Sequence, residues 1–169
     1  MGTCALLAEA LRYPAPGRIE MLEAGLMEMT GGGAKKAFSA FVERIQELSL
    51  GEWEELHTRT LDLNPPAAPY LGFQMWGESY KRGNFMAHLN YQIKELEIDT
   101  DGELPDHLIP VLRYLEAASQ RNASPSTELL EVLAPTVEKM RKVLRKSEPD
   151  NPYVYLFEAI LQIPQVVQG

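Results

Sequence analysis

LDLNPPAAPYL at residues 61–71 and ELPDHLIPVLRYL at residues 103–115 are the two stretches that organise this chain. Each of them combines a turn set by proline with apolar and acidic residues. A single segment of helix length lies between them, at residues 79–96. We therefore expect two loops that meet at one mouth and are held in place by helices on either side.

Outside these loops, apolar residues recur at helical spacing along the whole chain, and no alternating pattern is long enough to predict a strand. The expected fold class is all-α, a single-domain helical bundle of about eight to nine helices that covers residues 1–169. The expected helical segments are residues 6–11, 19–26, 38–48, 53–61, 68–75, 79–96, 105–115, 129–144 and 153–161.

Several residues mark where these helices begin or bend. Thr3 is expected to cap the first helix, and residues 49–52 (SLGE) have the pattern of a capping box. Pro105 suits the first position of a helix, where its missing N–H costs nothing. Pro110 is expected to bend or tighten that helix, and a bend is also expected just before Pro135.

Length, composition and the N-terminus predict a cytoplasmic protein without stable membrane insertion. The chain has 169 residues, 45% of them hydrophobic, which is enough for one buried core. Its apolar runs are too short to span a bilayer. The N-terminus lacks a basic segment and is interrupted by Glu9, unlike a signal peptide. The single Cys4 has no partner for an internal disulfide, which suits a reducing compartment.

The charge balance indicates what kind of partner the protein takes. The chain carries 24 acidic and 16 basic residues, a net charge of −8. This balance opposes nucleic acid as a partner, because binding there requires Lys and Arg to neutralise phosphates. A basic ligand fits better.

The residues that carry catalytic or metal chemistry do not form a recognisable set. His57, His88 and His107 lack the spacing that would place two metal ligands on one helical face, so we expect no metal and no cofactor. Cys4 lacks a CxxC partner. Asp106 and His107 are open to two interpretations. They are either an acid and a base, or a charged helix start followed by a surface histidine.

Four short motifs give the chain a resemblance to a known family. They are LRYP at residues 11–14, EELHTRTLDLN at 54–64, YL followed by WGESYKRG at 70–83, and ELPDH at 103–107. In this order and spacing they resemble the cytoplasmic redox-enzyme maturation chaperones of the TorD, DmsD and NarJ groups, and most of all the NarJ type. The resemblance reaches about residue 115. One departure is PPAA at residues 65–68, where polar residues are expected.

The resemblance implies a binding role without catalysis. Such chaperones bind the N-terminal peptide of a molybdopterin-containing catalytic subunit, here one like nitrate reductase. They assist cofactor insertion before membrane attachment or export. The expected partners are that N-terminal region and the machinery that delivers the molybdenum cofactor. The resemblance also implies a monomer or a domain-swapped dimer, with residues 122–125 and 147–152 as hinges.

The expected peptide site draws on both organising stretches. An apolar groove would accept one face of an amphipathic peptide, and an acidic rim would attract its basic residues. Alanine at Asp106 or His107 is then expected to weaken binding and leave the fold intact. The opposing interpretation is that the apolar members are core and the carboxylates solvated. The candidates are Asp62, Glu78, Glu103 and Asp106 for the rim, Tyr70, Trp76 and Leu108 for the groove, and Pro105 and His107 from the shared motif.

Two other functions stay open at this point. A small enzyme would use Asp106 and His107 as acid and base in a cleft. A structural subunit of an oxidoreductase complex would be bound permanently in a helical assembly and would expose a broad apolar patch.

Overall fold

The computed structural model describes residues 1–167, which form ten α-helices and two short helical turns without a β-strand. This confirms the all-α prediction, and eight of the ten helices have eight residues or more. The elements are α1 (Thr3–Leu11), α2 (Arg18–Glu28), α3 (Gly33–Gln46), α4 (Leu50–His57), the π-helical turn η1 (Thr58–Asp62), the 3₁₀ turn η2 (Pro65–Ala67), α5 (Leu71–Trp76), α6 (Tyr80–Glu95), α7 (Leu108–Gln120), α8 (Thr127–Ser147), α9 (Tyr153–Leu161) and α10 (Pro164–Val167).

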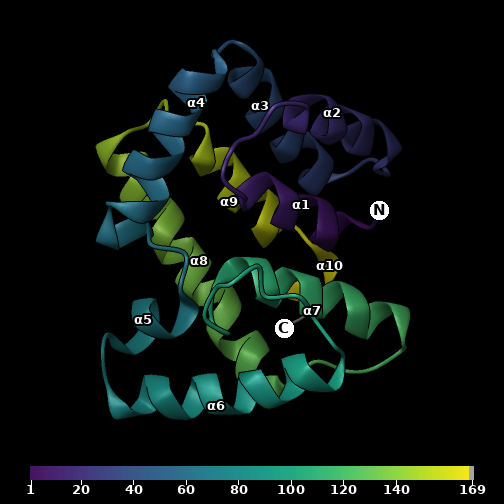
Figure 1. The fold of residues 1–169 in the computed structure, drawn as a ribbon, viewed down its shortest axis with the longest axis vertical. Coiled ribbons are helices and arrows are strands. Elements are labelled where there is room, and N and C mark those ends of the chain that lie inside the picture. Colours follow the sequence, from purple (N-terminus) through teal and green to yellow (C-terminus); the bar gives the residue numbers. More distant parts are fainter. Residues whose placement is uncertain (168–169) are drawn as a thin grey trace.

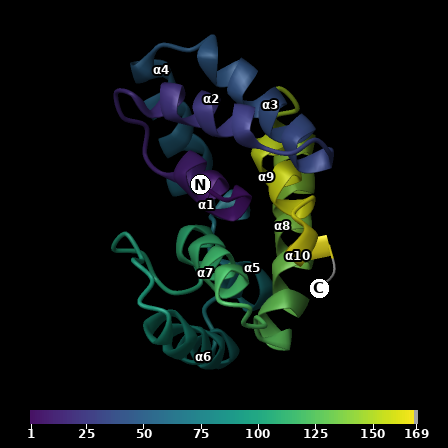
Figure 2. The same ribbon diagram turned by 90° about the vertical axis from the view of Figure 1, so that its right-hand side faces the viewer.

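The helices are arranged in two tiers joined by the long helix α8 (Figures 1 and 2). The upper tier holds α1 to α4 and α9, and the lower tier holds α5, α6 and α7. Helix α8 contacts α9 in the upper tier and α5 in the lower one, while α1 packs on α7 between the tiers. The connection from η1 through η2 to α5 therefore crosses from one tier to the other at the side of the molecule.

One contiguous apolar core extends through both tiers. In the upper tier, the stripe on α3 packs on α9, and the ring centroids of Phe41 and Tyr153 lie 5.4 Å apart. Phe38 and Phe157 are fully buried in the same layer. These side chains follow the 3.6-residue period, which is why the sequence alone indicated which faces turn inward.

Local signals predicted one helix start correctly and another wrongly. Ser49 Oγ accepts the Glu52 N–H at 3.1 Å and Glu52 Oε1 accepts the Ser49 N–H at 3.0 Å, so the capping box is confirmed. Thr3 is not a cap, because it is already the first helical residue and Gly2 occupies the N-cap without a side-chain bond.

Of the three prolines Pro105, Pro110 and Pro135, one behaves differently from what the sequence predicted. Pro105 does not begin a helix, because α7 starts at Leu108 with His107 as its N-cap. Pro110 is the third residue of α7, where a backbone N–H has no partner within the helix, so no bend is required there. Helix α8 continues through Pro135 as one element.

No helix among residues 1–167 is both long enough and apolar enough to cross a bilayer.

Candidate functional site

The two organising loops meet through their backbones. The Leu71 N–H donates to the Asp106 carbonyl at 2.8 Å, and the Leu108 N–H donates to the Pro69 carbonyl at 2.8 Å. These bonds pair Tyr70 with His107 in an isolated antiparallel bridge. The expectation that the two loops meet is thus confirmed. We call residues 69–72 and 104–108 the loop junction.

The buried Asp106 side chain links the two loops of the loop junction to each other and to α6. It is 0% exposed, and Oδ2 accepts both the Gly72 N–H and the Arg82 Nε–H at 3.0 Å. Arg82, which comes from α6, also donates from Nη2 to Oδ1 at 3.2 Å. The carboxylate therefore has a bidentate guanidinium and a backbone donor, as a buried charge requires. The predictions that Asp106 lies on a rim or charges a helix start are both wrong.

Gly72 is required by this close approach. A Cβ at this position would lie 2.9 Å from Asp106 Oδ2 and 2.8 Å from Arg82 Cγ. Any side chain would push the carboxylate and the guanidinium away from the backbone, so glycine permits the contact.

His107 caps α7 and is buried. Its Nδ1 accepts the Ile109 N–H at 3.0 Å, so the ring hydrogen resides on Nε2, 4.0 Å from Glu103 Oε2. The ring packs edge-on against Tyr70 with centroids 4.9 Å apart, and Tyr70 donates its hydroxyl hydrogen to Glu103 at 2.8 Å. The prediction that His107 lies at the surface is wrong, because only 6% of the residue is exposed.

Burial controls the ionisation of this histidine. Desolvation lowers the pKa of His107, and the carboxylates of Glu103, Asp106 and Asp62 oppose that shift. Desolvation and the neighbouring Glu103 raise the pKa of the Tyr70 hydroxyl, which keeps its hydrogen on the bond to Glu103. The neutral His107 is the form that can accept the Ile109 N–H.

We expect this arrangement to make stability depend on pH. Because the folded-state pKa of His107 lies below the unfolded value of about 6.5, the unfolded chain binds the proton first as pH falls. The stabilisation is complete above about pH 6.5 and is lost as pH falls through the folded-state pKa. His107→Asn keeps a capping oxygen without this titration, so its unfolding free energy should depend less on pH.

Urea denaturation between about pH 5 and pH 8 measures this difference, which amounts to about 1.4 kcal/mol for each unit of pKa difference. His88→Asn is the matched control, because the His88 side chain is 69% exposed. Equal pH dependence in His107→Asn and wild type would contradict the assignment.

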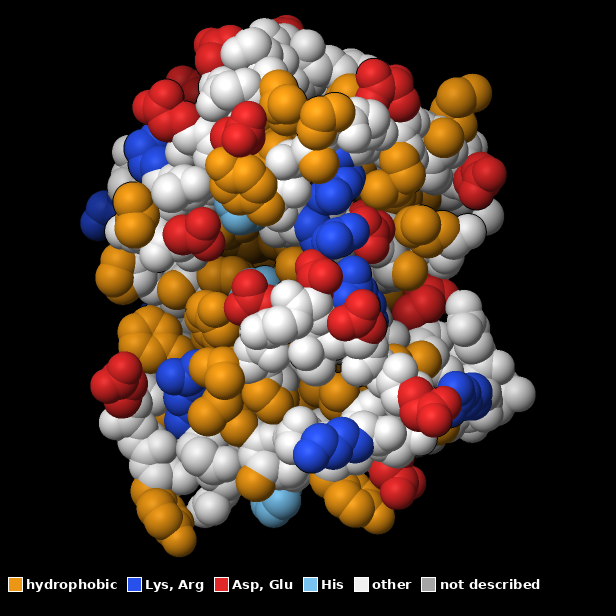
Figure 3. Space-filling view, in the orientation of Figure 1, with side chains coloured by type: hydrophobic (Ala, Val, Ile, Leu, Met, Phe, Trp, Pro, Cys, Tyr) orange, Lys and Arg blue, Asp and Glu red, His pale blue; other side chains and the backbone are white. Residues whose placement is uncertain are grey.

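An apolar cavity of about 350 Å³ opens beside the loop junction. Leu63 is 75% exposed and Leu104 49% exposed at its edge. Figure 3 shows hydrophobic side chains beside a hollow in the middle of this face, with acidic side chains at its edges. We call this cavity the mouth; it is lined by Asp62, Leu63, Pro65, Ala68, Tyr70, Phe73, Arg82 and Leu104.

The structure brings together some of the predicted site residues and separates others. Asp62 and Tyr70 line the mouth, and Glu103 is joined to it through the Tyr70 hydroxyl. Asp106, His107 and the half-buried Pro105 belong to the loop junction behind it.

Three predicted residues do not lie on the mouth. Trp76 packs edge-on against Phe85, with ring centroids 5.4 Å apart. Glu78 is exposed in the turn between α5 and α6. Leu108 is 0% exposed, so its predicted contact with a peptide is wrong for this conformation.

Sequence reasoning missed the residues that complete the site. Arg82, Gly72, Phe73 and Leu63 were not singled out, although Arg82 lies within the WGESYKRG motif. The available signal was Asp106 itself, because a carboxylate in an apolar loop needs a cation when it is buried.

The described residues hold no group of three or more His, Cys, Asp or Glu side chains arranged to bind a metal ion. Burial raises the pKa of the Cys4 thiol to about 12, so the thiolate needed for nucleophilic chemistry does not form near neutral pH. The expectation that the protein uses no cofactor stays a prediction.

The chain matches no known protein-family model and no curated protein. The resemblance to the redox-enzyme maturation chaperones therefore stays a prediction, and any function rests on the geometry of the mouth together with that resemblance.

Proposed function

We propose that this protein is a cytoplasmic chaperone for the catalytic subunit of a molybdopterin-containing oxidoreductase like nitrate reductase. It binds the N-terminal peptide of that subunit and assists cofactor insertion before membrane attachment or export. It performs no catalysis of its own. The observation that best supports this proposal is the mouth, an apolar cavity with carboxylates at its edge.

The apolar part of the mouth suits the apolar face of a peptide helix. Tyr70 and Phe73 line it, while the exposed side chains of Leu63 and Leu104 extend its apolar edge. Its volume of about 350 Å³ is at the small end for ligand sites. A cavity of this size holds anchoring side chains of a peptide rather than a whole organic cofactor.

The charges around the mouth favour a basic peptide. The Asp62 side chain is 54% exposed and that of Glu103 35% exposed. Arg82, the basic residue in the lining, is already paired with the buried Asp106. The electrostatic potential at the edge of the mouth is therefore negative. It accelerates association with a client peptide that carries Lys and Arg.

The loop junction keeps this surface ready for binding. Its two backbone bonds, together with the ion pair of Asp106 and Arg82, hold both sides of the mouth in one geometry. A site that is already ordered loses less conformational entropy when a peptide binds. Asp106 and His107 thus support binding from behind the surface.

The proposal is tested with the catalytic subunit of a molybdenum oxidoreductase encoded beside this gene. The tagged apo-subunit should co-purify with this protein, and a variant that lacks the N-terminal peptide should not. Calorimetry with the synthetic N-terminal peptide should give saturable binding, against a scrambled peptide as control. If this protein co-purified equally well with the truncated subunit, the proposal would be contradicted. If it stayed bound to the mature, cofactor-loaded enzyme, a structural subunit would be favoured instead.

We expect peptide association to slow several-fold as ionic strength rises, because rim charges are screened over about 8 Å at physiological salt. Apolar contact is not screened, so binding should persist. Asp62→Asn combined with Glu103→Gln should reproduce part of the loss. Stopped-flow fluorescence measures the association rate.

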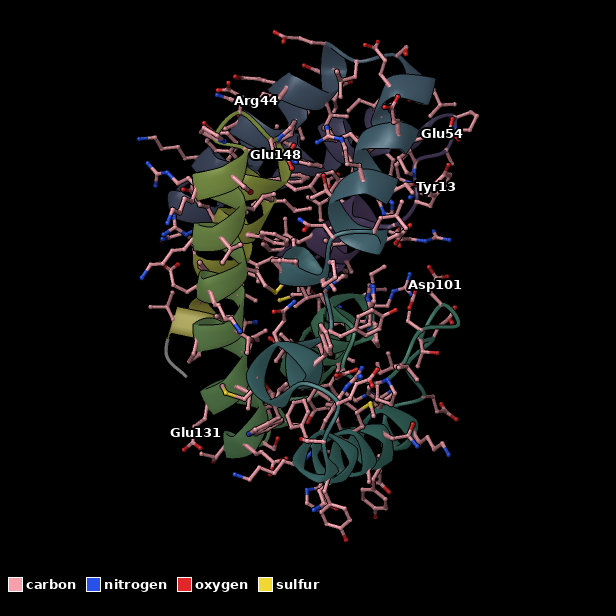
Figure 4. All side chains as sticks on the ribbon, turned by 90° about the vertical axis from the view of Figure 1, so that its left-hand side faces the viewer. Tyr13, Arg44, Glu54, Asp101, Glu131 and Glu148 are labelled. Carbon is pink, nitrogen blue, oxygen red and sulfur yellow. The ribbon has the colours of Figure 1, made fainter. Side chains whose placement is uncertain are left out.

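The matched control for that pair is Glu20→Gln with Glu131→Gln, which removes the same charge at exposed positions. Figure 4 shows Glu131 at the lower end of α8, on the opposite side of this view from Tyr13 and Glu54. A rate that is flat across salt, or an equal loss in both pairs, would mean that the carboxylates of the mouth are only solvated surface.

A further inference from the structure

His57, the last residue of α4, is a buried histidine with one ring nitrogen bonded and the other free. Its Nε2 lies 3.0 Å from the Leu11 carbonyl oxygen. A carbonyl oxygen only accepts, so Nε2 carries the hydrogen and the neutral ring presents a lone pair at Nδ1. In the part of the chain that the structure describes, Nδ1 has no hydrogen-bond partner, and the residue is 6% exposed.

The neighbours of His57 fix the direction of that lone pair. Tyr13 packs edge-on against the ring at 5.3 Å between centroids, and Tyr153 does so at 6.1 Å. Tyr13 is itself held by its hydroxyl, which donates to Glu54 at 3.0 Å, and Figure 4 shows these two residues on the same side of the molecule. The ring cannot turn without breaking the bond to Leu11.

The π-helical turn η1 places Asp62 in front of the free nitrogen. The hydrogen bond of this turn joins residues five apart, as a π-helix requires: the Leu63 N–H donates to the Thr58 carbonyl at 3.0 Å. Five residues after His57, the Asp62 carboxylate comes to 3.9 Å from Nδ1. That distance is too long for a hydrogen bond, and a carboxylate and an unprotonated Nδ1 are both acceptors. Single π-helical turns of this kind are frequent at functional sites.

We propose that His57 Nδ1 and Asp62 together bind one cationic nitrogen of the client, the ammonium of a lysine or the guanidinium of an arginine in its N-terminal peptide. This inference rests on the proposed function. Nδ1 itself is buried behind Asp62, so the 54%-exposed Asp62 side chain must turn to admit the ligand. A nitrogen with two or three hydrogens can then donate to both acceptors at about 2.9 Å. The negative charge of Asp62 selects a cation over a neutral amide.

The position of the pair agrees with a peptide in the mouth. Asp62 and Leu63 line the mouth, and Leu63 also lines a second hollow of about 470 Å³. A peptide that crosses Leu63 between the two hollows passes the Asp62 carboxylate. The second hollow adds negative charge, since it is lined by Tyr13, Glu54, Glu55, Thr58, Arg59 and Leu63.

A double-mutant cycle tests the assignment. His57→Gln keeps an N–H that can reach the Leu11 carbonyl but has no acceptor at the place of Nδ1. The probe is the N-terminal peptide of the catalytic subunit, with each Lys or Arg replaced in turn by norleucine. We expect one basic position whose replacement lowers wild-type affinity roughly tenfold, with little further loss in His57→Gln. His88→Gln is the matched control. Its peptide affinity should fall as much as that of wild type when the same basic residue of the peptide is replaced.

Asp62→Asn provides the same cycle at a side chain that is 54% exposed, so it remains informative should His57→Gln fold poorly. Nitrogen-15 spectra of the imidazole give a separate readout. In the free protein His57 should be the neutral Nε2–H tautomer, and peptide binding should shift the Nδ1 resonance toward that of a hydrogen-bonded acceptor.

Three outcomes would overturn the inference. One is a His57 ring protonated on both nitrogens in the free protein. A second is peptide binding by wild type without coupling of any basic position to His57 or Asp62, which would leave the proposed chaperone function standing. The third is no peptide binding by wild type at all, which would remove the proposed function as well.

Discussion

Arg82→Ala is expected to lower the free energy of unfolding by about 3–5 kcal/mol, because it leaves a buried carboxylate without its cation. Asp106 is 0% exposed, and the Arg82 side chain, 14% exposed, gives it two hydrogen bonds. The remaining Gly72 N–H offsets only part of that loss. Urea denaturation followed by circular dichroism measures the effect.

Two further variants show whether geometry or charge matters in this pair. Arg82→Lys keeps the charge but cannot form the bidentate contact, so an intermediate loss is expected. Arg121→Ala removes an exposed arginine and should change stability by about 0.5 kcal/mol or less. If Arg82→Ala proved as stable as Arg121→Ala, the pair would not stabilise the loop junction.

This ion pair changes how substitutions in the loop junction are interpreted. From the sequence, Asp106→Ala was expected to weaken peptide binding with the fold intact. With the structure in hand, we expect Asp106→Ala to destabilise the fold as well, because alanine there removes the partner of Arg82 and of the Gly72 N–H. Binding assays on Asp106 variants therefore need a stability measurement beside them.

Asn151→Ala is expected to lower the free energy of unfolding by about 2–4 kcal/mol, since two buried hydrogen bonds are lost together. Asn151 is 5% exposed, and its Oδ1 accepts the Tyr153 N–H at 2.9 Å at the start of α9. Its Nδ2 donates to Thr60 Oγ1 at 2.9 Å, which fastens η1 to α9. Removing the side chain releases both elements.

Asn151→Ser separates the two contributions, because serine can still accept the Tyr153 N–H but does not reach Thr60. About half of the loss is expected in that variant. Hydrogen exchange at residues 58–62 should accelerate in both variants. The control is Asn84→Ala, at an exposed position of α6, where no loss is expected. An Asn151→Ala variant within about 0.5 kcal/mol of wild type would contradict this role.

The parts of the fold that follow from short-range chemistry were predictable. The stripe containing Phe38, Phe41 and Ile45 repeats at helical spacing, and these residues are buried on α3 as expected. The capping box at Ser49 joins residues three apart, so the sequence alone shows it. The meeting of the two proline loops was predicted on a different basis, the similar composition of two stretches that lie far apart in sequence.

The errors occur where a distant residue decides the local structure. Pro105 suits a helix start locally, yet the chain turns there and Asp106 points to Arg82, 24 residues away in sequence. The sequence joined α4 and the following residues into one helix, whereas the chain widens into η1 and is held there by Asn151, 91 residues from Thr60. Neither partner is visible in a local pattern.

The sequence by itself determined the all-α class and the inward faces of the helices, because periodicity and capping act over a few residues. It also indicated the two loops that meet at the loop junction. Only the tertiary structure decided which side chains of those loops line the mouth. It buries Asp106, His107 and Leu108 and exposes Asp62 and Leu63. The physical reason is that a buried carboxylate needs partners, and those of Asp106 come from elsewhere in the chain: Arg82 on α6 and the Gly72 N–H of the paired loop.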